Sequence, residues 1–318
     1  RRPPRSTLSS SSAASDVYKR QPLEFCIFII FFFFFFVLPL NISRKLGVFL
    51  ALRFGQMTKA NKIINKNLMI AFPDKSNEWI AQTNRGVWTN FGKVLAEYAK
   101  LNKIAKNNII KIIENNYSKS FFERSENKIL ISAHNANWEI PGIACRIKSN
   151  KISGIVREPN NPFIRFILSY LRNKYSVRCY QKNLIGTKKL MRDFKNGFSL
   201  ALLADQKLSS GIEIKFFGKN VYATALPAQL ALKSKSDIYL AWPKRQGNNF
   251  EFKFCELIES SKLQDNEDNK IKIITLSLAI VSITIIKLVL NPVEPTAPTI
   301  MPAVAMAIPT PTILIAPF

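Results

Sequence analysis

The sequence predicts an α/β protein with a mostly parallel central sheet flanked by helices, together with an N-terminal membrane-anchor helix and a helical platform. Three observations lead to this prediction. From residue 128 onward, short apolar runs of strand type alternate with helical segments, as in proteins with a parallel sheet. Residues 43–116 repeat their apolar side chains at helical spacing. An uncharged apolar run, Phe25–Leu40, precedes both.

The strand and helix predictions for the α/β part follow from apolar runs and their periods. Strands are expected at Ile129–Ser132, Ile152–Val156, Phe198–Ala204, Ile238–Trp242 and Phe250–Leu257. Helices are expected at Trp138–Ile147, Pro162–Lys174, Lys188–Asn196 and Leu226–Lys235. With the helical segment before them, these elements make up one predicted domain over residues 43–268.

The N-terminal segments precede this domain. Residues 1–21 are Ser-rich and resemble translated adapter sequence, so they are left out of the fold prediction. The apolar run is slightly shorter than the ~20 residues that span a bilayer, and the basic pair Arg44-Lys45 follows it. We interpret residues 22–42 as an uncleaved membrane anchor whose basic side is cytoplasmic. A buried core helix is the alternative.

The helical segment carries an apolar face and a basic face. Leu46, Phe49 and Leu50 follow the i, i+3, i+4 rule, while Lys59 and Lys66 lie on another face. Basic amphipathic helices beside an anchor are typical of a platform on a membrane surface. Ordinary solvated lysines on the backs of helices would give the same pattern, and the sequence leaves both interpretations open.

The end of the chain has a different composition. Residues 275–290 are apolar apart from Lys287, and Asn291–Phe318 is rich in proline. Proline forbids a regular helix in that last stretch. We interpret residues 269–318 as a divergent low-complexity tail, either native or the product of a frameshift.

Composition limits the classes of partner and of site. The chain has 318 residues, of which 47% are hydrophobic, so it is not a disordered protein. Its 46 Lys and Arg against 21 Asp and Glu give a net charge of +25. Such a surplus predicts a polyanionic partner, which is nucleic acid, anionic lipid or an acidic carrier protein. The four cysteines are widely spaced and indicate neither a zinc site nor a dense disulfide framework.

His134 is the one histidine of the chain, and it follows the predicted strand Ile129–Ser132. Catalytic groups collect at the carboxyl ends of strands in open α/β sheets. Glu139 lies five positions further on, and a loop between them would bring its carboxylate back to the imidazole. That contact would fix the tautomer and stabilise the imidazolium. The sequence therefore predicts His134 and Glu139 as a catalytic pair, with a structural histidine as the alternative.

The motif from His134 to Glu139, a histidine and an acidic residue separated by four residues, resembles that of the bacterial lipid A biosynthesis (lauroyl/myristoyl) acyltransferases. This family belongs to the glycerolipid and lysophospholipid acyltransferases. The resemblance extends from about residue 44 to 258. Other matching blocks follow the family's order: Asn67–Pro73, Arg157–Pro162, Leu203–Lys207, Lys215–Gly218 and Thr224–Lys233.

The resemblance implies transfer of a fatty acyl chain from acyl carrier protein to a hydroxyl of a Kdo-bearing lipid A precursor, at the cytoplasmic face of the inner membrane. A sister enzyme acting on a lysophospholipid, an ornithine lipid or another glycolipid is the alternative. The expected partners are acyl carrier protein, an anionic glycolipid and the membrane lipid surface. Nucleic acid is not expected, because the chain has no clear basic recognition helix or stacking module. No metal or organic cofactor is expected.

The resemblance also implies roles for individual residues. His134 would act as the general base and Glu139 would hold it. The expected substrate-binding residues are Arg157, Asn161, Pro162, Asp205, Gln206, Phe217, Gly218 and Thr224. Arg157 would grip a phosphate of the acceptor or stabilise the oxyanion. Asp205 and Gln206 would orient the acceptor headgroup, or are simply turn residues. Phe217 would wall an acyl channel, or is simply core.

Overall fold

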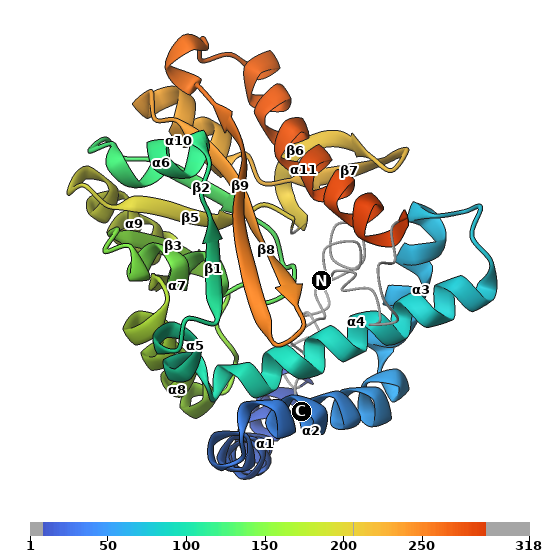
Figure 1. Cartoon of the computed structure of the whole chain (residues 1–318). Helices are drawn as coiled ribbons and strands as arrows, with labels where there is room; N and C mark the ends of the chain where they lie inside the picture. Colours follow the sequence, from blue (N-terminus) through green and yellow to red (C-terminus); the bar gives the residue numbers. More distant parts are fainter. Residues whose placement is uncertain (1–8, 206, 291–318) are drawn as a thin grey trace, which may run out of the picture.

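The computed structural model describes residues 9–205 and 207–290 (Figure 1). Its helices are α1 Ser9–Val37, α2 Leu40–Phe54, α3 Lys59–Ala71, α4 Asn77–Tyr98, α5 Leu101–Lys106, α6 Asn116–Glu123, α7 Ile140–Ile147, α8 Pro162–Tyr175, α9 Leu184–Lys195, α10 Leu226–Ser234 and α11 Glu267–Leu290. Its strands are β1 Ile110–Ile113, β2 Ile129–Ser132, β3 Ile152–Val156, β4 Arg178–Gln181, β5 Ser199–Leu203, β6 Lys207–Phe216, β7 Lys219–Ala223, β8 Ile238–Gln246 and β9 Asn249–Ile258.

Seven of these strands form one sheet in the order β1-β9-β8-β2-β5-β3-β4. The five strands from β8 to β4 are parallel to one another. Strand β9 is antiparallel to β8, and β1 is parallel to β9. Strands β6 and β7 form a separate hairpin. The predicted α/β class with a mostly parallel sheet flanked by helices is confirmed.

The sheet is covered on both faces, which explains why its central strands read as unbroken apolar runs. Alternate residues of a strand point to opposite faces. Ile129 and Ile131 accordingly pack in a cluster with residues of α9, α10, α11 and the β6–β7 hairpin, whereas Leu130 packs with residues of α4, α5 and α7. The C-terminal edge of the parallel strands is thereby held rigidly between two packed layers.

Helices α2, α3 and α4 form the predicted helical platform, with α2 and α4 below the sheet and α3 to its side (Figure 1). Helices α2 and α4 touch through their backbones, since a Cβ added to Gly47 would meet the Gly92 carbonyl oxygen at 2.2 Å. Helix is observed over most of residues 43–116, but its extension through residue 113 is wrong. Ile110–Ile113 forms β1, because it pairs with β9 at the edge of the sheet.

Both ends of the described chain are helical. In α1, the segment Arg20–Val37 is long and apolar enough to cross a membrane, and only 6% of it is buried, so a buried core helix does not describe it. Helix α11 packs Ile273, Ile274 and Leu278 into the core, past the domain boundary expected at residue 268. The predicted proline-rich tail, residues 291–318, lies outside the described residues, as do residues 1–8.

Candidate active site

His134 and Asp205 meet at the carboxyl ends of two neighbouring strands. Ser132 of β2 is in register with Leu203 of β5, so the residues two positions further on also lie side by side. The Nδ1 atom of His134 lies 2.8 Å from Oδ1 of Asp205. The backbone N–H of His134 donates to Oδ2 of the same carboxylate, also at 2.8 Å. Asp205 therefore fixes both the ring and the main chain of His134.

The chemistry of this pair follows from its burial. The Asp205 side chain is fully buried and that of His134 is 10% exposed. A carboxylate only accepts hydrogen bonds, so Nδ1 carries the proton and Nε2 is the nitrogen able to take one. A buried carboxylate on Nδ1 also stabilises the imidazolium that forms when Nε2 is protonated. This is the geometry that a general base with an orienting carboxylate requires.

Glu139 occupies a different network, so the carboxylate that orients His134 is Asp205. Oε1 of Glu139 accepts hydrogen bonds from the Tyr98 hydroxyl at 2.6 Å and from Nε of Arg172 at 2.7 Å. Burial would raise the pKa of Glu139, but the Arg172 charge and these hydrogen bonds outweigh it and hold the pKa below its usual range. Glu139 is therefore ionised and locks α7 to α4 and α8.

Glu97, next to Tyr98 on α4, braces the same loop. Its Oε2 accepts from Nδ2 of Asn137 at 2.8 Å, and Oδ1 of Asn137 accepts from the backbone N–H of Glu139 at 2.9 Å. The Arg44 and Arg245 guanidiniums both bind Oε1 of Glu97. Burial opposes ionisation here too, but the charge of Arg245, with that of Arg44, keeps the pKa of Glu97 low.

The loop between β2 and α7 is held in a strained form. Ala136 has a φ of 46°, in the left-handed region that costs a residue with a Cβ about 1–2 kcal/mol. The Trp138 ring lies 5.5 Å from the His134 ring, centroid to centroid, and its Nε1 donates to the Tyr98 hydroxyl at 2.8 Å. Two adjacent residues of α4, Glu97 and Tyr98, thus hold the loop that carries His134.

Arg157 follows the end of β3, the strand beside β5, and its side chain is exposed. It therefore stands at the same sheet edge as His134 and Asp205. Phe217 and Gly218 form the two-residue turn of the β6–β7 hairpin, both with positive φ, where glycine is favoured. The Phe217 ring packs 5.8 Å from Phe72, which ends α3. Gln206 lies outside the described residues.

The other three predicted binding residues stand at the starts of helices. Asn161 caps α8 by accepting from the backbone N–H groups of Phe163 and Ile164, and Pro162 is the first residue of that helix. Thr224 accepts a 3.4 Å hydrogen bond from the backbone N–H of Leu226, at the start of α10. These contacts give each of them a local structural task.

Comparison with known proteins assigns this arrangement to a family. The model of the bacterial lipid A biosynthesis acyltransferase family matches residues 16–276. The chain belongs to this family. Among curated proteins no match was found. The crystal structure of the 1-acyl-sn-glycerophosphate acyltransferase PlsC from Thermotoga maritima is 11% identical, with a TM-score of 0.37, over 77% of this chain and 98% of that one.

In this lipid A acyltransferase family member, several site residues escaped sequence reasoning. Tyr98, Glu97 and Arg172 lie on helices remote in sequence from the His134 loop, and only tertiary packing brings them to it. Glu97 and Arg172 lie in segments that the sequence predicts as helices, but no local pattern indicates that their charged side chains are largely buried. Asp205 was identified, but for the acceptor headgroup and not for His134.

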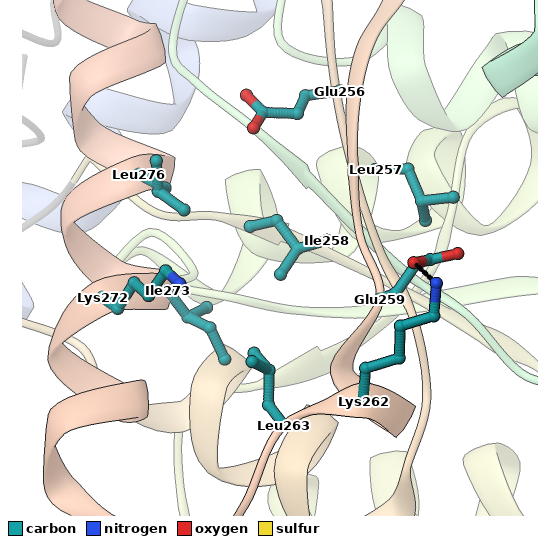
Figure 2. Close-up of a pocket in the computed structure, with 9 residues that line it drawn as sticks. All are labelled: Glu256, Leu257, Ile258, Glu259, Lys262, Leu263, Lys272, Ile273 and Leu276. Carbon is teal, nitrogen blue, oxygen red and sulfur yellow. Dashed lines mark ion pairs between the residues drawn. The ribbon is translucent and has the colours of Figure 1, made fainter.

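A hollow of about 270 Å³ lies at the amino ends of the parallel strands, whereas His134 lies at their carboxyl ends. Figure 2 shows it between the end of β9 and α11, with Glu259 paired to Lys262 at its rim. Ile258 of β9 pairs with Ile238, at the start of β8, whereas His134 follows the end of β2. This hollow therefore belongs to the packing of α11 and not to the acyltransferase centre.

The two buried cysteines are poor nucleophiles. Burial raises the pKa of the Cys145 thiol far above its usual value and that of Cys179 to about 11. The thiolate is the reactive form of cysteine, and it is scarce at neutral pH when the pKa is this high. An acyl-cysteine route through either residue has no support from its surroundings.

Proposed function

We propose that this acyltransferase moves a fatty acyl chain from an acyl carrier protein thioester to a hydroxyl of a Kdo-bearing lipid A precursor. The hydrogen bond between Nδ1 of His134 and Asp205, at the carboxyl ends of β2 and β5, carries the proposal. It supplies an oriented general base where a bound hydroxyl needs one.

The proposed reaction has two proton transfers. Nε2 of His134 takes the hydroxyl proton as the acceptor oxygen attacks the thioester carbonyl carbon. The tetrahedral intermediate collapses when the carbon–sulfur bond breaks, and the leaving thiolate of the carrier protein takes the proton back from His134. Asp205 balances the imidazolium between the two transfers. Glu139, bound to Arg172 and Tyr98, keeps the loop in place throughout.

Two neighbouring features suit the two substrates. Arg157 is exposed at the same sheet edge, where its guanidinium would bind a phosphate of the anionic acceptor. Ala133 packs in an apolar cluster with Ile64, Leu68 and Trp88 of the platform, and Phe217 of the hairpin turn packs against this cluster. We assign the acyl chain of the donor to this side of His134.

The test is acyl transfer by purified protein in detergent, with acyl carrier protein thioester as donor. The Kdo-bearing precursor is offered beside a lysophospholipid and an ornithine lipid precursor. The proposal predicts product with the Kdo-bearing acceptor and its loss in His134→Ala. Transfer only to another acceptor would move the enzyme to a sister reaction, and unchanged activity of His134→Ala would overturn the catalytic assignment.

A further inference from the structure

Helix α1 has two faces with different surroundings. The face that includes Gln21, Glu24 and Phe28 is partly covered by the protein, and Phe35 on the same face is only 6% exposed. The opposite face is exposed and consists of apolar side chains. They are Leu23, Ile27, Ile29, Ile30, Phe33, Phe34, Phe36 and Val37. A water-exposed apolar face of this extent marks a contact with a membrane or another protein.

The domain holds the apolar segment of α1, Arg20–Val37, at both of its ends. Near the C-terminal end, the Ser43 hydroxyl donates to the Phe35 carbonyl oxygen at 3.0 Å, and the Lys100 ammonium donates to the Phe36 carbonyl oxygen. Near the N-terminal end of this segment, Nδ2 of Asn161 donates to the Gln21 carbonyl oxygen at 2.7 Å. There the Phe25 and Phe163 rings also lie 5.2 Å apart, centroid to centroid.

These two attachments conflict with a helix that crosses the bilayer. Gln21 and Phe35 are about 21 Å apart along the helix axis at 1.5 Å per residue. If α1 crossed the bilayer, Gln21 would lie near the far leaflet. The start of α8 would lie there too, because Asn161 binds Gln21. The capping amide of Asn161 and the guanidinium of Arg165 would then lie in or beyond the hydrocarbon. Polar groups placed there are costly.

Helix α8 continues the exposed surface of α1. Phe163, Phe166 and Tyr170 lie on one face of α8 at i, i+3 and i+7 and are 54%, 74% and 52% exposed. Arg165 and Lys174 flank this stripe, as cations do where a helix lies on anionic headgroups. In Figure 1, α1 and α2 lie together at one end of the molecule with α8 next to them.

We propose that α1 does not cross the membrane but lies along the domain within a single leaflet, and that the aromatic stripe of α8 rests in the same lipid surface. The partner of this surface is a bilayer with anionic headgroups. The proposal rests on the attachments of α1 and α8 and is independent of the acyl donor and acceptor. The N-terminal anchor would therefore lie in the plane of the membrane and would not span it.

Cysteine labelling tests the proposal in native membranes. In a Cys26→Ser, Cys255→Ser background, Arg20→Cys reports the start of the apolar segment and Lys182→Cys, exposed after β4, reports the catalytic domain. A membrane-impermeant maleimide is applied to spheroplasts and to inverted vesicles. An in-plane helix predicts that both positions are labelled from the same side. Labelling from opposite sides would overturn the proposal.

A crosslink in the membrane gives a second readout that does not depend on solvent access. In the same background, Phe25→Cys with Phe163→Cys should be joined by a short bis-maleimide within one chain. The matched control pairs Phe163→Cys with Ile30→Cys, which lies on the exposed face of α1. Efficient crosslinking of the first pair alone is expected. Failure of the first pair in membranes, in protein that remains folded, would show that α1 leaves the domain.

Discussion

His134 is oriented by a carboxylate 71 residues away in the chain, and not by the one five residues away. The sequence identifies the histidine because it is single and follows a strand. Its partner depends on which strand lies beside β2, and the parallel pairing with β5 decides this. The pairing of strands is set by the whole sheet, so no local pattern reveals it.

Asp205→Asn should reduce kcat by about 10²–10⁴-fold, the usual contribution of general base catalysis. The amide keeps the shape of the side chain but removes the charge that fixes the tautomer and balances the imidazolium. Steady-state kinetics of acyl transfer measure the effect, and KM should change little. Asp193→Asn is the matched control, because Asp193 is a buried carboxylate on α9 that accepts a hydrogen bond from Tyr180 of β4, away from His134. An equal loss in both variants would contradict the assignment.

Glu139→Gln should make the free energy of unfolding less dependent on pH in the acid range. The folded-state pKa of Glu139 is below its unfolded value, so the ionised group stabilises the fold above the ordinary glutamate range, near a pKa of ~4.3. This stabilisation is lost as the pH falls through the folded-state pKa. Urea unfolding should therefore show wild type more stable than the variant at pH 7, with the difference shrinking below pH ~4. A difference that is constant with pH would contradict it.

At the scale of elements, α4 connects the platform to the catalytic loop. Glu97 binds Arg44 of α2, Arg245 of β8 and Asn137 of the loop, while Tyr98 binds Glu139 and Trp138. Burial raises the pKa of the Tyr98 hydroxyl well above its usual value, so it stays protonated and donates to Glu139. Helix α2 is thus linked through α4 to the loop that carries His134.

Glu97→Ala should destabilise the fold by about 3–5 kcal/mol, because it leaves two buried guanidiniums without their carboxylate. Chemical denaturation in detergent measures the change. Glu123→Ala, at the exposed end of α6, is the control and should leave the midpoint nearly unchanged. If the two variants unfold at the same denaturant concentration, the contacts of Glu97 do not stabilise the fold.

The elements that sequence reasoning found are those with a strong local pattern. The apolar runs of β2, β3, β5 and β9 and the amphipathic helix α8 are all observed close to their predicted bounds, whereas β8 starts as predicted but runs on to Gln246. Strands β1 and β4 and the β6–β7 hairpin were missed. Strands β1 and β4 have four residues each and lie at the two edges of the sheet, and the hairpin lies outside the sheet. All of them mix polar with apolar residues, so that pairing and not periodicity makes them strands.

At the scale of the whole molecule, α11 closes one face of the core. Ile273, Ile274 and Leu278 are buried there although the sequence placed the end of the domain at residue 268. Ile273→Ala should therefore cost about 2–5 kcal/mol, as for other fully buried isoleucines. Ile271→Ala is the control, because Ile271 lies two residues earlier on the other side of α11 and is 40% exposed. Equal denaturation midpoints would mean that α11 does not pack on the domain.

The whole chain carries a large positive charge, which bears on the proposed partners. With a net charge of +25, it suits an acidic carrier protein, an anionic acceptor and an anionic membrane together. Orientation on the lipid surface by α1 and α8 would present the edge of the sheet that carries His134, Asp205 and Arg157. In this proposal the fold would combine a catalytic sheet edge with an apolar face that holds the protein at the membrane.

The most direct test of the central claim uses the fact that His134 is the one histidine of the chain. Protein labelled with ¹⁵N-histidine gives a single imidazole, whose tautomer and titration are followed by NMR while acyl transfer rates are measured over the same pH range. The account predicts an Nδ1–H tautomer that is lost in Asp205→Asn, and a rate that rises with pH as the imidazole loses its proton. An Nε2–H tautomer in wild type, or an acyl transfer rate that does not follow the titration of the imidazole, would contradict the account.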